Sequence, residues 1–112
     1  MASRKNHEHI LSQFCSIIER HPDEILRSDT ICSQLGVSGR TLRNICRNSL
    51  KMSPRQFAAR HRMELARQQL RAGSRVTTAA TNHGFFELGR FASTYRKVYG
   101  ELPSETMRMQ RA

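Results

Sequence analysis

The chain has 112 residues, enough for one compact domain or for two half-size units that each bury too little surface to be comfortably stable unless they are braced together. Apolar residues make up 38% of the chain, with five Phe, two Tyr and no Trp, a composition that favours a small all-helical protein over a β-rich one. No segment approaches the roughly 18 consecutive apolar residues of a membrane-spanning helix, and no apolar signal-peptide core follows the first residues. We therefore expect a cytoplasmic protein that does not bind membranes.

The formal net charge of +10 is unevenly distributed. Residues 1–37 contain four basic and five acidic residues, whereas residues 38–112 contain fifteen basic and four acidic residues. A concentrated positive surface attracts polyanions and speeds encounter with them, so nucleic acid is the favoured class of partner. The alternative is a basic surface that is merely solvated.

The first two predicted helices lie before the basic region. Apolar residues at helical spacing predict a helix over residues 7–20, which His21 and Pro22 end. Ser28 or Asp29 caps a short second helix that reaches Leu35. The apolar stripe of the first helix must pack on another element, and it consists of Ile10, Leu11, Phe14, Ile17 and Ile18.

The third predicted helix is the first candidate for reading DNA. Gly36 and Val37 turn the chain, and Ser38 caps the helix that follows. Leu42, Ile45 and Cys46 face inward in this pattern. The polar side chains that face outward are Arg40, Arg43, Asn44, Arg47 and Asn48.

The fourth predicted helix is the longest. Ser53 caps it, Pro54 occupies its first position, and it reaches about Ala72 before Gly73 stops it. Its apolar residues lie on more than one side, as expected if it contacts both halves of the chain. About 20 residues give a length of roughly 30 Å, close to one turn of B-DNA, so this helix is long enough to set the distance between two DNA-reading helices.

Three shorter helices complete the predicted order. Thr77 or Thr78 begins the fifth helix, which ends at His83 and Gly84. The sixth runs over residues 87–99 and is closed by Gly100, and the last runs from residue 103 to about 110. The sixth helix turns Phe91, Tyr95 and Val98 inward and exposes Arg90, Ser93, Arg96 and Lys97.

One turn pattern occurs twice along the chain. Cys32 precedes Gly36 by four positions, and Ala80 precedes Gly84 by four. The offset between the copies is 48 before the turn and 49 after it. A small residue lets two helices approach closely and a glycine permits the turn, which is typical of a helix-turn-helix. The sequence therefore predicts one helix-turn-helix subdomain over 1–52, a linker helix over 53–73 and a second subdomain over 74–112.

At this point the chain resembles the DNA-binding domain of the AraC/XylS family of bacterial transcription regulators, over about residues 8–110. The resemblance implies an all-α fold of about seven helices, with two helix-turn-helix subdomains joined by a long helix. It also implies sequence-specific binding of double-stranded DNA in adjacent major-groove segments, recruitment of RNA polymerase, and a further effector-binding or dimerisation domain that these residues do not include. The motifs that carry it are Cys32-Ser33-Gln34-Leu35-Gly36-Val37-Ser38 with Leu42, Ser53-Pro54 with Phe57, Arg62-Met63 with Ala66 and Leu70, His83-Gly84-Phe85 with Phe91, Tyr95-Arg96-Lys97, Tyr99-Gly100 and Pro103-Ser104.

The resemblance assigns candidate roles to residues of both predicted reading helices. In the first, base reading falls on Arg40, Arg43 and Asn44, whose side chains suit bidentate pairing with guanine and adenine. In the second, the matching positions are Leu88, Gly89, Ala92 and Ser93, which offer one hydroxyl and otherwise apolar or backbone contact. Either Arg90 and Glu87 read bases by a shifted docking, or this half holds phosphates and reads DNA shape, or Arg90 merely solvates the surface. The candidate base-reading residues are thus Arg40, Arg43, Asn44, Gly89, Arg90 and Ser93, and the candidate phosphate-binding residues are Ser38, Arg47, Arg96 and Lys97.

One position departs from the family pattern. Lys51 stands where Gly100 stands in the second copy and where the family's first unit usually has glycine. If that position needs a positive φ, lysine costs about 1–2 kcal/mol there, unless the turn differs.

Other function classes receive less support from the sequence. The alternative to DNA binding is a non-catalytic interaction module that uses its basic face on an acidic protein. We expect no enzyme, because no carboxylate pair, Ser-His-Asp set or Cys-His pair falls on one plausible face, and Glu64 among arginines is typical of a helix ion pair. The cysteines, Cys15, Cys32 and Cys46, lack a C-x-x-C spacing and are expected as small buried side chains, with no metal and no cofactor.

Overall fold

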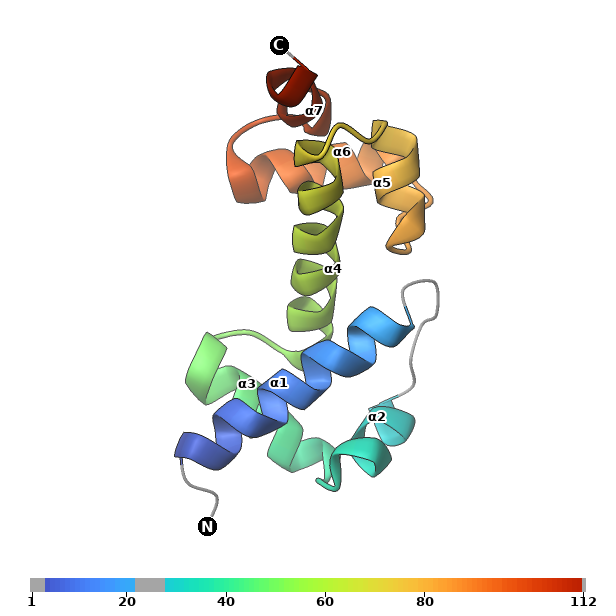
Figure 1. Cartoon of the computed structure of the whole chain (residues 1–112). Coiled ribbons are helices and arrows are strands. Elements are labelled where there is room, and N and C mark those ends of the chain that lie inside the picture. The colour runs from blue at the N-terminus through green and yellow to red at the C-terminus, as the bar shows by residue number, and fades with distance from the viewer. Residues whose placement is uncertain (1–3, 22–27, 112) are drawn as a thin grey trace. The chain divides into compact units, whose positions relative to one another are not determined.

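The computed structural model of the chain describes residues 4–21 and 28–111 (Figure 1). This part of the chain contains seven helices and no strand, which confirms the prediction of an all-α fold with about seven helices. None of these helices is long and apolar enough to cross a membrane. The helices are α1 (Arg4–Arg20), α2 (Ser28–Leu35), α3 (Gly39–Leu50), α4 (Pro54–Arg71), α5 (Val76–Asn82), α6 (Leu88–Tyr99) and α7 (Pro103–Arg111).

The chain divides into two compact units, residues 1–61 and residues 62–112. Helix α4 contributes to the core of each, because Phe57 and Ala58 pack against the first core while Met63, Ala66 and Leu70 are buried in the second. This confirms that the apolar residues of α4 serve both halves. The division at 52/53 and 73/74 that the sequence indicates stays a prediction.

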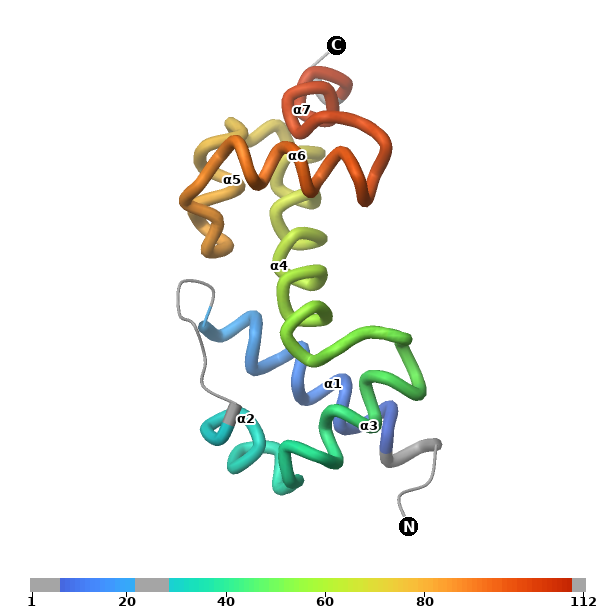
Figure 2. Tube along the Cα trace, turned by 180° about the vertical axis from the view of Figure 1, so that it is seen from behind, coloured from blue at the N-terminus to red at the C-terminus, as the bar shows by residue number. Residues whose placement is uncertain are grey.

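The first unit is built on α1, α2 and α3, which contact one another (Figures 1 and 2). Helix α1 begins at Arg4, three residues before the predicted start, because apolar periodicity locates only the packed stripe of a helix and not its polar first turn. The role predicted for Pro22 lies outside the described residues. The buried side chains of this core are Phe14, Ile17, Ile18, Ile31, Cys32, Leu35, Leu42 and Cys46.

The second unit packs α5, α6 and α7 together with the end of α4. Its centre is aromatic: the ring of Phe91 lies 4.9 Å from that of Phe85 and 5.7 Å from that of Tyr95, centroid to centroid. The hydroxyl groups of Tyr95 and Thr106 are hydrogen-bonded at 2.8 Å, which ties α6 to α7. Buried hydroxyls normally find such partners, since an unpaired one costs free energy.

A second tyrosine ties α6 to α4. The Tyr99 hydroxyl donates a hydrogen bond of 2.7 Å to the carboxylate of Glu64, and the guanidinium carbon of Arg67 lies 4.2 Å from the centre of the Tyr99 ring. Burial and the bond to the Glu64 carboxylate raise the pKa of Tyr99. Glu64, which we expected in an ion pair along its own helix, therefore links two helices of the second unit.

The predicted start of the fifth helix is wrong. Helix α5 begins at Val76 rather than at Thr77 or Thr78, and the residue at its N-cap, Arg75, provides no side-chain cap. The reason is tertiary: Val76 packs against the second core, which holds it in the helix although the sequence places a threonine at each of the next two positions. A threonine is a good cap only where packing leaves it outside the helix.

Candidate nucleic-acid interface

Two equivalent turns position the candidate reading helices α3 and α6. Gly36 has φ 71° and Gly84 has φ 86°, the left-handed region that glycine enters without steric cost. Each turn is closed by one hydrogen bond spanning three residues and one spanning five, a common way to end a helix. In the first turn these run from Gly36 N–H to Ser33 O (3.3 Å) and from Val37 N–H to Cys32 O (3.1 Å), and in the second from Gly84 N–H to Thr81 O (3.2 Å) and from Phe85 N–H to Ala80 O (2.9 Å).

The one-residue difference between the two copies lies after these turns. Helix α3 starts at Gly39, three residues after the turn glycine, whereas α6 starts at Leu88, four residues after it. From there on the backbones correspond at an offset of 49: Leu42 N–H donates to Ser38 O and Phe91 N–H to Glu87 O, both at 3.0 Å. The repeat that the sequence shows is therefore a repeat of backbone hydrogen bonds.

Ser38 caps the N-terminus of α3. The Ser38 hydroxyl oxygen accepts a 3.1 Å bond from the Thr41 backbone N–H and donates one of 2.9 Å to the Thr41 hydroxyl, which confirms Ser38 as the cap. A capped first turn holds the side chains behind it in one place. The hydroxyl of Ser38, predicted to bind phosphate, is thus already engaged within the helix.

The exposed face of α3 carries the predicted readers. Leu42, Ile45 and Cys46 are buried, as expected. On the opposite side Arg40, Arg43, Asn44 and Arg47 are all exposed, and their spacing of i, i+3, i+4 and i+7 places them in one stripe along the helix. Within the described residues, no hydrogen bond or ion pair engages these four side chains. The structure therefore brings all the candidate readers of the first unit onto one solvent-facing stripe.

The exposed face of α6 is different in character. Phe91 and Tyr95 are buried, while Gly89, Arg90 and Ser93 are exposed together with the predicted phosphate ligands Arg96 and Lys97. A guanidinium nitrogen of Arg90 lies 4.0 Å from a carboxylate oxygen of Glu87, and both side chains are more than three-quarters exposed. Such a pair contributes little in water, so it does not hold Arg90 away from a ligand.

The candidate reading helices α3 and α6 are both followed by a left-handed residue. Lys51 has φ 59° and Gly100 has φ 77°, and each donates its N–H to the carbonyl four residues back, Arg47 O at 3.1 Å and Arg96 O at 2.8 Å. The two turns therefore have the same form, and Lys51 occupies a conformation that glycine adopts more cheaply. Lys51 is the one non-glycine residue with a positive φ in the described part of the chain.

Comparison with known proteins agrees with this geometry. The helix-turn-helix domain family matches residues 31–109, which is more than two-thirds of the chain. A probable AraC family transcriptional regulator from Rhodopseudomonas palustris CGA009 has a structure similar to this one, with a TM-score of 0.77 and 33% sequence identity over 93% of this chain and 99% of that chain. The chain belongs to the AraC/XylS family of transcription regulators. It corresponds to the family's DNA-binding domain, which is not an enzyme.

Other relatives of this AraC/XylS domain are full-length regulators. The XylDLEGF operon transcriptional activator of Pseudomonas putida is 36% identical over 76 residues, which are 64% of this chain and 24% of that protein. A probable thc operon regulatory protein of Rhodococcus erythropolis is 35% identical over 95 residues, 81% of this chain and 29% of that protein. The chain thus spans about a quarter of the length of the curated relatives it matches.

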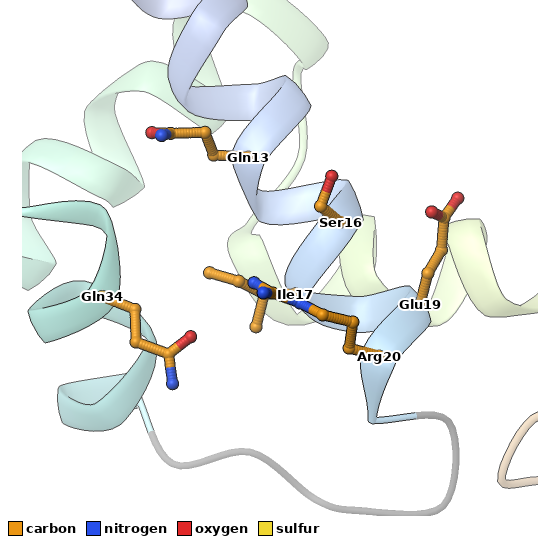
Figure 3. Close-up of a pocket in the computed structure, with 6 residues that line it drawn as sticks. All are labelled: Gln13, Ser16, Ile17, Glu19, Arg20 and Gln34. Carbon is orange, nitrogen blue, oxygen red and sulfur yellow. The ribbon is translucent and has the colours of Figure 1, made fainter.

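The AraC/XylS domain also has an open pocket in its first unit, about 690 Å³ in volume, between α1 and α2 (Figure 3). The pocket contains one carboxylate, that of Glu19, and an oxygen of this carboxylate lies 3.0 Å from Nε2 of His61. The Glu19 side chain is about half exposed, so this pair with His61 lies at the surface of an open pocket. The lining residues are Gln13, Ser16, Ile17, Glu19, Arg20 and Gln34.

The three thiols of the domain lie apart from the candidate interface. Cys15, Cys32 and Cys46 are free, and Cys32 and Cys46 are buried, as expected of small core residues, whereas Cys15 is half-buried. Burial raises the pKa of the Cys46 thiol to about 11. Among the residues that the structure describes, no group of three His, Cys, Asp or Glu side chains is placed to hold a metal ion.

Proposed function

We propose that this domain binds double-stranded DNA at specific sequences, with α3 and α6 each entering a major-groove segment. The observation that carries the proposal is the stripe of Arg40, Arg43 and Asn44 on α3, exposed and unengaged within the described residues. Arginine pairs bidentately with guanine O6 and N7, and asparagine with adenine N6 and N7, each pair being worth about 1–3 kcal/mol of discrimination. These three residues are the base readers of the first unit.

Phosphate contacts supply affinity in this proposal. Arg47 and Arg96 hold equivalent positions in the two units, and both are exposed, as is Lys97 beside Arg96. Cations at the flanks of a recognition helix meet phosphates, which fix the register of the protein without reading sequence. The start of α3 at Ser38 meets a phosphate through backbone amides, because the Ser38 hydroxyl already binds Thr41.

The second unit reads bases through Gly89, Arg90 and Ser93, all of which are exposed on α6. Of these three residues only Arg90 has a long polar side chain, so the second unit makes fewer hydrogen bonds to bases than the first. Less of the sequence preference is therefore expected from the second unit.

Further partners are proposed from the relatives. The matched Pseudomonas putida protein is named a transcriptional activator, which supports recruitment of RNA polymerase by this domain as well. Those relatives are about three times as long as this chain, which supports a partner domain for effector binding or dimerisation. The setting we propose is the bacterial cytoplasm, where the DNA lies.

The first experiment is selection of bound duplexes from a randomised DNA pool at near-physiological salt, with this chain alone. Enrichment of two short blocks about one helical turn apart supports two reading helices, and a single block leaves the second unit as a phosphate clamp. Pools that stay random would refute sequence-specific binding by this chain.

Alanine variants then assign the readers. Arg43→Ala and Asn44→Ala should each lower the preference for the selected site over random DNA about 5- to 150-fold, the equivalent of 1–3 kcal/mol. Arg71→Ala is the matched control, since it removes one exposed cation at the end of α4. If the Arg43 and Asn44 variants lose general affinity but keep the preference, these two residues act through polar contacts to the backbone of the DNA and are not the base readers.

A further inference from the structure

Helices α3 and α6 carry side chains of different size and polarity at equivalent positions. Backbone hydrogen bonds make Leu42 and Phe91 equivalent, so positions in α3 and α6 correspond at an offset of 49. Long polar side chains of α3 are replaced by small ones in α6, while the phosphate-binding arginine is kept. The pairs are Arg40 with Gly89, Arg43 with Ala92, Asn44 with Ser93, and Arg47 with Arg96.

Packing in the free domain does not explain the glycine in this set. Gly89 does not have a positive φ, and a Cβ placed on it would meet no atom of another part of the chain within 4 Å. Alanine therefore fits at this position, and glycine near the start of a helix lowers helix stability relative to alanine. What glycine offers here is a helix surface that can approach a ligand closely.

Exposed apolar surface gathers at the same end of α6. Phe86 is 66% exposed and Leu88 is 38% exposed, and the other large exposed apolar side chain in the described part of the chain is Met109 of α7. Phe85 closes the second turn as Val37 closes the first, and both pack against their cores. Phe86 is the extra residue that follows the second turn, so exposure at this place is particular to the second unit. Leu88 thus sits on the helix face that carries the small residues Gly89 and Ala92.

The cations on α6 decide which occupant fits this surface. Arg90, Arg96 and Lys97 are exposed on the same helix as Leu88, so the partner is a polyanion that also presents apolar groups. The major groove of DNA has one such group on a base edge, the C5-methyl of thymine, and apolar side chains contact it. Charge and apolar character together select double-stranded DNA.

We infer that Leu88 reads thymine by contact with its C5-methyl group, and that Gly89 and Ala92 let α6 approach the bases closely enough for this contact. The inference rests on the proposed function and names the contact by which the second unit reads a base. The first unit then reads bases by hydrogen bonds from long side chains, and the second adds apolar contact at short range to the bonds that Arg90 and Ser93 make.

The test replaces thymine by deoxyuridine in the second block of the selected duplex, because the two bases differ only in the C5-methyl group. The wild-type domain should bind the deoxyuridine duplex about fourfold more weakly for each methyl contacted, the equivalent of burying one methylene. Leu88→Ala should bind the thymine duplex more weakly than wild type does and should no longer distinguish the two duplexes. Met109→Ala is the matched control, since it removes an exposed apolar side chain from α7, and it should behave as wild type.

A second variant tests the close approach. Gly89→Ala should keep or raise the melting temperature, because alanine favours the helix, yet weaken binding to the second block severalfold. Equal binding by Gly89→Ala and wild type would overturn the close approach.

Failure of the inference can be told from failure of the proposed function. If the second block contains no thymine, or if deoxyuridine changes nothing, or if Leu88→Ala still responds to the methyl group, the inference is wrong while the proposed function stands. If no sequence is enriched at all, the proposed function fails, and this inference with it.

Discussion

Truncating Phe91 tests the placement of α6, the second candidate reading helix, most directly. The side chain is 2% exposed and lies between the rings of Phe85 and Tyr95 at 4.9 and 5.7 Å. Phe91→Ala removes the buried ring, leaves a cavity among these neighbours and should cost about 3–5 kcal/mol of unfolding free energy. The loss exceeds that of the ring's area alone because both aromatic contacts disappear with it.

Urea unfolding followed by circular dichroism measures this loss. A domain of about 100 residues loses about 4–8 °C of melting temperature per kcal/mol, so the heated variant should also unfold more than 10 °C earlier. Phe91→Leu is the matched control: it keeps most of the volume, loses the ring contacts and should cost less than half as much. Leu42→Ala, at the equivalent position of the first unit and 3% exposed, should cost about 2–5 kcal/mol.

A melting curve of Phe91→Ala that matches wild type would refute the reasoning. It would mean that Phe91 does not anchor α6, and the exposed face we assign to Gly89, Arg90 and Ser93 would then be misplaced. Amide hydrogen exchange provides a local readout, since the variant should lose protection in α5, α6 and α7.

Three further predictions concern the interface, the turns and the thiols. Arg96→Ala or Lys97→Ala should weaken binding to all duplexes alike and reduce the slope of log affinity against log salt by about one, measured by titration at several salt concentrations; an equal loss of sequence preference would contradict the phosphate role. Gly100→Lys should destabilise the domain by about 1 kcal/mol, because a Cβ there has space but the left-handed backbone disfavours it; an unchanged urea midpoint would contradict the assigned φ. Since the Cys46 thiol is buried with a pKa of about 11, iodoacetamide at pH 8 should modify Cys15 well before Cys46 in the native protein, as quantified by peptide mass spectrometry; the reverse order would contradict the burial.

Local features of the sequence were enough to predict most of the fold. Capping residues such as Ser38 and Ser53 bond their own first turns, and these bonds depend only on residues three positions away. The glycines at 36 and 84 mark turns because few other residues enter the left-handed region cheaply. Apolar periodicity then showed which side of each helix is buried, and the exposed stripe of α3 followed from it.

The sequence predicted the candidate interface only as far as that interface depends on which side of each helix is buried. The sequence placed Arg40, Arg43 and Asn44 on the outside of α3, where the structure has them. It did not single out the exposure of Phe86. The one-residue-longer second turn was a signal for it, since Phe85 takes the packed position that Val37 holds in the first unit and Phe86 is the extra residue after it.

The sequence by itself determined the helical order, the two turns and the polar face of each reading helix, because these depend on neighbours within one helical turn. Only the tertiary structure decided features that involve residues far apart in the chain. Packing on the second core starts α5 at Val76, and the Glu64 carboxylate meets the hydroxyl of Tyr99, 35 positions away. Lys51 is a different case, because its left-handed backbone closes α3 through a hydrogen bond to a carbonyl only four residues back, and a lysine side chain does not itself favour that conformation.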